Sequence, residues 1–259
     1  MGTICIITPI TTQGFRDVSQ VSAFAPAGTT LSCVTLERGP ASVESALDEV
    51  LAGPGVVDAA LKAQAGGCDA IVIDCMLDPA LEAVREAVTI PVVGCGQAGL
   101  ETAAQLGAFS VVTVLQRQER AFIRLANSYG LSDRLASVLG IGVNVLDLDK
   151  ARQTAITATV AACAKARKRD EASAVVFGCT GMLGYGEEVA QALGWKPERV
   201  IDPLVNAISV AARAISANAG TDKNEYPFPE KKQVVGFEDW PNLEQSFDSI
   251  RNKGSDQFK

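Results

Sequence analysis

Two of the seven cysteines, Cys75 and Cys179, stand in matching sequence contexts that suit proton transfer. The chain has no histidine, so proton transfer near neutral pH falls to Cys, Asp, Glu, Lys and Tyr side chains. Each of the two cysteines follows a β-branched run and precedes a loop of turn residues and then a helical segment. Backbone N–H groups and a helix dipole at such a place favour a thiolate. The pair is therefore a candidate base and acid.

The remaining cysteines carry weaker signals. Cys5, Cys33 and Cys163 fit the usual role of free cysteine as a small buried hydrophobe, whereas Cys95 follows another predicted strand and is a third candidate without a counterpart. No CxxC pair exists and the count is odd, so neither a structural zinc nor a disulfide framework is expected. Residues 1–9 do not resemble a signal peptide, and no apolar run is long enough to span a membrane. We expect a cytoplasmic protein.

Charge and composition narrow the possible partners. The 259 residues include 23 Lys and Arg against 30 Asp and Glu, which gives a net charge of -7. A broad basic surface for nucleic acid is therefore absent, and we expect a small-molecule substrate instead. Without histidine, Ser-His-Asp and Cys-His sites and the HExxH zinc helix are excluded.

Short β-branched runs alternate with longer Ala-rich segments along the chain. This alternation predicts an α/β fold with mainly parallel strands whose faces are covered by helices. The predicted strands are 3–8, 30–36, 70–74, 90–93, 109–115, 138–146, 174–177 and 199–201. The predicted helices are 42–51, 56–65, 79–87, 100–106, 118–129, 151–169, 187–193 and 204–217.

An internal repeat places the two cysteines in equivalent positions. The run CDAIVIDCMLDPALEAV followed by IPVVG parallels ASAVVFGCTGMLGYGEEVAQALG followed by RVIDPLV, with the two cysteines 104 residues apart. Ligands bind beyond the carboxyl ends of parallel strands, so one thiol from each lobe would line a shared cleft. We predict lobes of residues 1–97 plus 205–259 and of 98–204, with the two sulfurs unbonded and about 6 to 8 Å apart. The charged, aromatic-rich residues 219–259 predict an irregular tail anchored by aromatic side chains.

A glycine-rich segment supports a different class of function. Gly94 to Gly99 matches G-x-G-x-x-G after a predicted strand, and Glu119 lies 20 residues past Gly99, where a ribose-binding acid would fall. Against this interpretation, the next strand ends near Leu115 and the segment lies in mid-chain. A dinucleotide-dependent or small-molecule-binding protein is the alternative outside the enzymes considered below.

Several residues around the two cysteines are candidates for substrate binding. The first strand runs into a loop at Thr8, Pro9 and Ile10, beyond the strand end where ligands bind. Backbone N–H groups around Met76 and Leu77, and around Thr180 and Gly181, would stabilise an enolate oxygen. The full candidate set is Thr8, Pro9, Ile10, Met76, Leu77, Thr113, Thr180 and Gly181.

Four motifs resemble the aspartate/glutamate/hydantoin racemase superfamily. They are CDAIVIDC ending at Cys75, the DP of Asp78 and Pro79, IPVVG at 90–94, and FGCTGM at 177–182, and the likeness runs from about residue 3 to 217. Within the superfamily the chain is most similar to hydantoin racemases, which include allantoin racemases. The resemblance implies two pseudo-symmetric, flavodoxin-like lobes, no cofactor, and catalytic cysteines at Cys75 and Cys179.

Departures from the family pattern bear on the substrate. Glutamate racemases carry a His beside the second Cys, which this chain lacks, whereas the sequence at 178–182 matches hydantoin racemases. The NPNT-like opening loop of hydantoin racemases reads TPIT at 8–11, without its two amide side chains. The resemblance implies a two-base racemase of 5-substituted hydantoins or related cyclic ureides, and we expect a homo-oligomer. The alternatives are an allantoin or amino-acid racemase and a maleate-type cis–trans isomerase.

Overall fold

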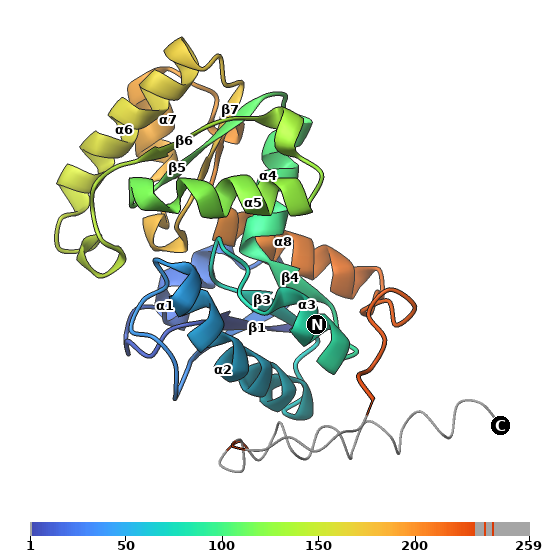
Figure 1. The fold of residues 1–259 in the computed structure, drawn as a ribbon. Coiled ribbons are helices and arrows are strands. Elements are labelled where there is room, and N and C mark those ends of the chain that lie inside the picture. The colour runs from blue at the N-terminus through green and yellow to red at the C-terminus, as the bar shows by residue number, and fades with distance from the viewer. Residues whose placement is uncertain (1, 231–235, 237–239, 241–259) are drawn as a thin grey trace.

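Two four-stranded parallel sheets form the framework of the protein (Figure 1). The structure is a computed structural model that describes residues 2–230, 236 and 240. The first sheet has the order β2 (Thr29–Thr35), β1 (Gly2–Thr8), β3 (Ala70–Ile73), β4 (Val92–Gly94). The second has the order β6 (Leu135–Gly140), β5 (Phe109–Thr113), β7 (Ala174–Phe177), β8 (Val200–Ile201). The same order in both sheets confirms the predicted fold of two pseudo-symmetric, flavodoxin-like lobes.

The central strands are buried apolar runs, as expected of parallel sheets covered on both faces. Ile4, Ile6 and Ile7 of β1 are fully buried and pair in register with β3, where Ile4 lies opposite Ala70. In the second sheet, β5 pairs with β7 in the same way, with Phe109 opposite Ala174. The matched registers bring the ends of β3 and β7 to equivalent points of their sheets.

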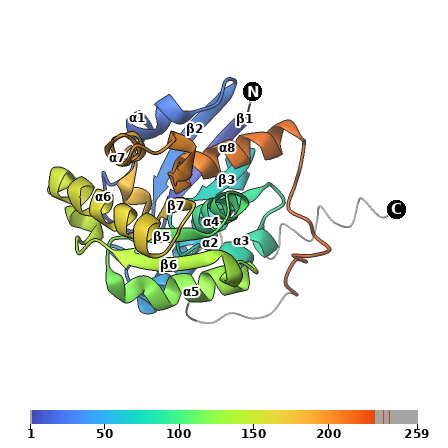
Figure 2. The ribbon, with the colours of Figure 1, turned by 90° about the horizontal axis from the view of Figure 1, so that it is seen from above.

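Helices cover the sheets and also join them. The first lobe carries α1 (Val18–Val21), α2 (Ala46–Ala65), α3 (Leu81–Ala87) and α8 (Pro203–Ser216), and the second carries α5 (Glu119–Ser128), α6 (Arg152–Arg169) and α7 (Gly186–Leu193). Helix α4 (Cys95–Gln105) packs against α8 and also against β7 and β8, so it lies at the junction of the lobes (Figure 1; Figure 2). The Asn206 amide of α8 donates to the Ala98 carbonyl oxygen and to the Thr102 hydroxyl of α4. The predicted domain boundaries at 97/98 and 204/205 remain predictions.

Four predicted elements differ from the structure by three residues or more at one or both ends. Helices 42–51 and 56–65 form the single helix α2, because Ala52, Val56 and Ala60 are buried on both sides of Pro54 and hold the helix despite its missing N–H. The strand predicted over 138–146 ends at Gly140, whose N–H donates to the side chain of Gln116 rather than continuing a ladder. The helix predicted from residue 100 begins at 95, where a side chain described below caps it.

The described part of the C-terminal tail is irregular, as predicted, and its aromatic residue Tyr226 contacts α3. The Lys223 ammonium donates to the Arg85 and Glu86 carbonyl oxygens, and the Arg85 guanidinium lies 5.3 Å from the centre of the Tyr226 ring. Trp240 stacks beneath the Arg38 guanidinium. The predicted anchors Phe237, Phe247 and Phe258 lie outside the described residues. Among the described residues, no helix is long and apolar enough to cross a membrane.

Candidate active site

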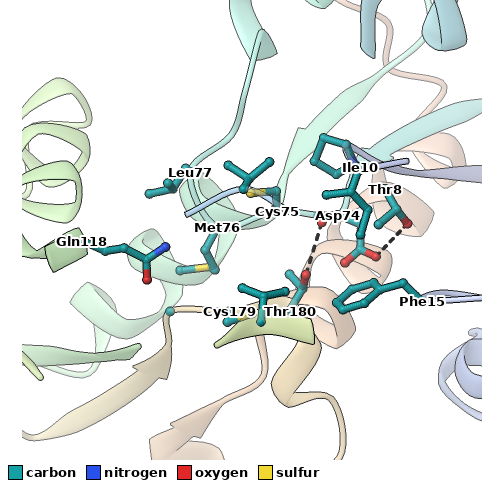
Figure 3. Close-up of a pocket in the computed structure, with 14 residues that line it drawn as sticks. Thr8, Ile10, Phe15, Asp74, Cys75, Met76, Leu77, Gln118, Cys179 and Thr180 are labelled. Atoms are coloured by element: carbon teal, nitrogen blue, oxygen red, sulfur yellow. Dashed lines mark hydrogen bonds between the residues drawn. The ribbon is translucent and has the colours of Figure 1, made fainter. Parts of the chain in front are cut away.

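Cys75 and Cys179 line one cavity between the two sheets (Figure 3). Cys75 comes two residues after β3 ends and Cys179 two residues after β7 ends, so each lobe contributes one thiol from the equivalent place. Both cysteines are free. The cavity has a volume of about 30 Å³, room for about one water molecule. The described residues that line it are Thr8, Pro9, Ile10, Phe15, Val43, Asp74, Cys75, Met76, Leu77, Gln118, Val145, Gly178, Cys179 and Thr180.

Eight of the ten predicted site residues line this cavity, and the other two, Thr113 and Gly181, form hydrogen bonds with residues that line it. The Thr113 hydroxyl is 2.7 Å from the side-chain oxygen of Gln118 and 3.1 Å from the Gly178 carbonyl oxygen, and both of these partners line the cavity. Gly181 donates its N–H to the sulfur of Cys179 at 3.4 Å. Thr113 and Gly181 therefore support the cavity wall, while the roles of all ten residues in catalysis or binding remain predictions.

Burial raises the pKa of both thiols. Desolvation raises the pKa of Cys179 to about 12, against the lowering effect of the Gly181 N–H. Desolvation likewise raises the pKa of Cys75 well above its usual value, against the Leu77 N–H. The predicted backbone donors are present and each lowers the pKa of its thiol, but loss of hydration has the larger effect.

A buried ion pair, which the sequence did not predict, joins the two cysteine loops. The Arg16 Nε donates to Asp74 Oδ2 at 2.8 Å, and its Nη2 donates to the Thr180 carbonyl oxygen at 2.7 Å. Thr8 and Thr180 add hydroxyl bonds to the Asp74 carboxylate and carbonyl oxygens (Figure 3). Asp74 directly precedes Cys75, and its place after a buried strand is the one signal that marks it in the sequence. The pair thus holds the loop of one lobe against the loop of the other.

A second, larger cavity adjoins the first. It has a volume of about 600 Å³ and shares the lining residues Phe15 and Val145 with the cysteine cavity. Phe24 and Lys150 line only the larger cavity. The Phe15 ring lies close to where a side chain on Gly181 would begin, 3.1 Å from the position of such a Cβ. Phe15 therefore forms part of the wall between the two spaces.

The glycine-rich segment at the start of α4 is occupied by a side chain of the protein. The Asp78 carboxylate accepts the N–H groups of Gly96 and Gln97 at 2.8 and 2.6 Å, and also the Tyr129 hydroxyl at 2.7 Å. These are the amides that a dinucleotide fingerprint would offer to a pyrophosphate. Cys95, the third cysteine candidate, is fully buried at the first position of α4 and does not line the cysteine cavity. The structure supports neither a dinucleotide site nor a reactive thiol here.

Comparison with known proteins places the chain in a family. The model of the Asp/Glu/hydantoin racemase family matches residues 4–211. The chain belongs to this family.

Relatives of this racemase family member agree in sequence and in fold. This chain is 35% identical to the hydantoin racemase of Pseudomonas sp. (strain NS671), and the match covers 90% of this chain and 94% of that protein. The structure of allantoin racemase from Klebsiella pneumoniae superimposes with a TM-score of 0.86 at 29% identity and covers 93% of this chain and 99% of that one. Allantoin racemase from Pseudomonas fluorescens gives a TM-score of 0.82 at 29% identity, covering 90% of this chain and 100% of the other.

Metal-ligating groups do not gather in the part of the chain that the structure describes. No cluster of three or more Cys, Asp or Glu side chains there has a metal-binding arrangement.

Proposed function

We propose that the protein racemises 5-substituted hydantoins or related cyclic ureides by a two-thiol mechanism. The observation that carries the proposal is that two free thiols, from equivalent ends of β3 and β7, line one cavity. Inverting a carbon by proton transfer requires a base on one face and an acid on the other. Two lobes that each supply one sulfur fit this requirement.

The two thiols and the substrate supply every proton and electron pair that the proposed reaction needs. One cysteine, as a thiolate, takes the hydrogen of ring carbon C5 as a proton. The C–H electron pair moves into the adjacent ring carbonyl and forms an enolate. The other cysteine, as a thiol, then delivers its proton to the opposite face of C5 while the enolate returns its charge, so the product is the other enantiomer. The two sulfurs finish with exchanged protonation states, ready for the reverse reaction.

Groups of the cavity wall are suited to hold the enolate. Met76 and Thr180 directly follow the two cysteines, and within the described residues their backbone N–H groups have no hydrogen bond. The Gln118 side-chain oxygen is engaged by the Thr113 hydroxyl, which turns its amide nitrogen the other way. We assign these three N–H donors to the ring carbonyl oxygens, because preorganised donors in a dry site lower the cost of developing charge.

The charges around Cys179 bear on which thiol ionises. The Arg16 guanidinium lowers the pKa of Cys179 and the Asp74 carboxylate raises it, after the larger effect of desolvation. Because a charged Cys179 raises the pKa of Cys75, the two titrate as a coupled pair. One negative charge shared by the two sites is the reactive form in the proposed mechanism.

Allantoin and acyclic substrates are the alternatives within this class. Allantoin is a hydantoin with a ureido group at C5, and two of the similar structures are allantoin racemases. A free amino acid would place its own carboxylate in a cavity whose described lining holds one charged side chain, the Asp74 carboxylate. A maleate-type isomerase would use one thiol as a nucleophile, so the two cysteines would have unequal roles.

We also propose that the protein is cytoplasmic and homo-oligomeric. The free state of all seven cysteines supports a reducing compartment. Leu47, Val50 and Leu51 are exposed on one side of α2, and such a cluster supports contact with a second copy. Light scattering of the purified protein would show a dimer or larger assembly if this is right, and a monomer if it is wrong.

The deciding experiment is incubation of resolved 5-substituted hydantoins and allantoin with the protein in deuterated water. Optical rotation should decay to zero, and deuterium should appear at C5 of the product. The Cys75→Ser/Cys179→Ser double variant is the matched control and should leave both signals at the uncatalysed rate. Retained rotation with every ureide and the wild-type protein would overturn the proposal.

A further inference from the structure

Asp74 lines the cysteine cavity, and one of its carboxylate oxygens is buried without a hydrogen-bond partner. The Asp74 side chain is 0% exposed, and its Oδ1 has no partner among the described residues. A buried polar atom left unpaired is costly, so a native protein normally reserves it for a ligand or a water molecule. This oxygen therefore indicates an acceptor that awaits a donor.

The other oxygen of the same carboxylate is held firmly. Asp74 Oδ2 accepts Arg16 Nε at 2.8 Å and the Thr8 hydroxyl at 3.1 Å. These two donors fix the rotation of the carboxylate group. The orientation of Oδ1 is thus preset before any ligand enters, as a specificity contact requires.

We propose that Asp74 Oδ1 accepts the N1–H of a ureide ring and so selects substrates with a nitrogen donor beside the reacting carbon. The inference rests on the proposed function and names a residue that recognises the substrate. Its partner must be a hydrogen-bond donor, because a carboxylate paired with Arg16 offers only lone pairs.

Sequence adjacency decides between the two ring nitrogens. Asp74 and Cys75 are consecutive, so their Cα atoms are about 3.8 Å apart. The Cys75 sulfur must reach the hydrogen on C5, and N1 is bonded to C5, whereas N3 lies on the far side of a carbonyl carbon. An acceptor next to the reacting thiol is therefore placed for N1–H.

Asp74→Asn tests this contact because it reverses the polarity of one atom. The Arg16 and Thr8 donors will hold the amide oxygen of Asn in the place of Oδ2. The amide NH₂ then faces the cavity, where the carboxylate presented an acceptor. A ring with oxygen at position 1 lacks the N1–H and can accept from this NH₂. The matched substrates are a 5-substituted hydantoin and the oxazolidine-2,4-dione with the same substituent.

The measurement is kcat/KM for deuterium exchange at C5 with both rings. Relative to the wild-type protein, Asp74→Asn should lower kcat/KM for the hydantoin about 10- to 100-fold. This is the range expected for loss of a hydrogen bond to a charged group. The oxazolidinedione lacks this contact, so the ratio of the two values, hydantoin over oxazolidinedione, should fall at least about 10-fold. Equal losses for both rings would show that Asp74 only supports the structure, and would overturn the inference.

Asp58 provides a matched control. It also has a buried, unpartnered Oδ1, but it lies on α2 and does not line the cysteine cavity. Asp58→Asn should leave the preference between the two rings unchanged, and a shift equal to that of Asp74→Asn would overturn the inference.

A second measurement uses the wild-type protein alone and so does not depend on the folding of a variant. The N3-methyl hydantoin should remain a substrate, whereas the N1-methyl isomer, which adds the same bulk, should lose at least about 10-fold in kcat/KM. Equal rates for the two isomers would overturn the contact with Asp74. If the unmethylated hydantoin shows no exchange, the proposed function itself fails and this inference fails with it.

Discussion

The Arg16 guanidinium donates to the Thr180 carbonyl oxygen at 2.7 Å, and this bond crosses from one lobe to the other. The same guanidinium pairs with Asp74, and the Arg16 and Asp74 side chains are 3% and 0% exposed. Asp74 precedes Cys75, and Thr180 follows Cys179. One side chain therefore ties together the two loops that carry the thiols.

Removing this arginine should destabilise the protein strongly. Arg16→Met leaves the Asp74 carboxylate buried without its partner, and we expect a loss of about 3 to 5 kcal/mol in the free energy of unfolding. Arg16→Met/Asp74→Asn removes the stranded charge, so its loss should be clearly smaller than the sum of the two single losses. Urea unfolding followed by circular dichroism measures all four proteins. Additive losses would show that the two side chains do not interact.

Replacing either cysteine should abolish racemisation but not all exchange. With Cys75→Ser or Cys179→Ser, one face of C5 loses its acid or base, so no enantiomer is inverted. The remaining thiol can still exchange deuterium into the enantiomer whose hydrogen points at it, with retention. The favoured enantiomer should differ between the two variants, which proton NMR in deuterated water will show. The same preference in both variants would refute bases on opposite faces.

The pH dependence of kcat/KM should report the raised pKa values of the thiols. The mechanism needs one thiolate, and burial raises the pKa of Cys179 to about 12 and that of Cys75 well above 9.0. Below both values the thiolate fraction of the free enzyme grows tenfold per pH unit. We expect kcat/KM to rise about tenfold per unit between about pH 6 and pH 8, after subtraction of the uncatalysed rate. A plateau in that range would mean that a thiolate already exists in the free protein.

Phe15 should restrict the size of the substituent at C5. It stands between the cavity of about 30 Å³ and the larger one of about 600 Å³, so Phe15→Ala joins the two spaces. The ratio of kcat/KM for a benzyl over a methyl hydantoin should rise about tenfold. Phe24 lines only the larger cavity, and Phe24→Ala is the control that should leave this ratio within about threefold. An unchanged ratio in Phe15→Ala would show that substituents do not pass Phe15.

The parts of the site that the sequence predicted are those set by strand ends. Cys75 and Cys179 follow buried apolar runs, and parallel pairing brings such ends to one edge, so local pattern and topology together predict their common cavity. Arg16 could not be found this way. It pairs with a residue 58 positions away and with the carbonyl of another 164 positions away, and no local pattern encodes either contact.

The errors in secondary structure have a similar cause. Pro54 breaks a helix by local rules, yet burial of Val56 and Ala60 against the rest of the lobe outweighs one lost hydrogen bond. The early start of α4 depends on Asp78, whose carboxylate arrives from a different loop to accept the first N–H groups of the helix. In both cases tertiary contacts decided what local propensity left open.

Asp78 should give the protein a measurable dependence of stability on pH. Burial raises its pKa from 3.8 to about 6, against the lowering effects of the Tyr129 hydroxyl and of the Gly96 and Gln97 N–H groups. Between these two pKa values the folded protein holds a proton that the unfolded chain has lost. The burial of Asp78 therefore costs the fold no titration free energy below about pH 4. Stability falls as the pH rises to about 6 and is constant above that, with a total loss of about 3 kcal/mol.

Two variants isolate this effect from the other carboxylates. Asp78→Asn cannot titrate, so the difference between its unfolding free energy and that of the wild type should change with pH only between about 4 and 6. Tyr129→Phe removes a donor that favours the charged carboxylate, so the pKa of Asp78 should rise further and the fall in stability should extend above pH 6. Urea unfolding at half-unit steps from about pH 4 to pH 8 measures both. If the wild type and Asp78→Asn give parallel curves, the Asp78 carboxylate titrates at the same pH in the folded and unfolded chain, and the Tyr129 and α4 N–H bonds then compensate fully for its burial.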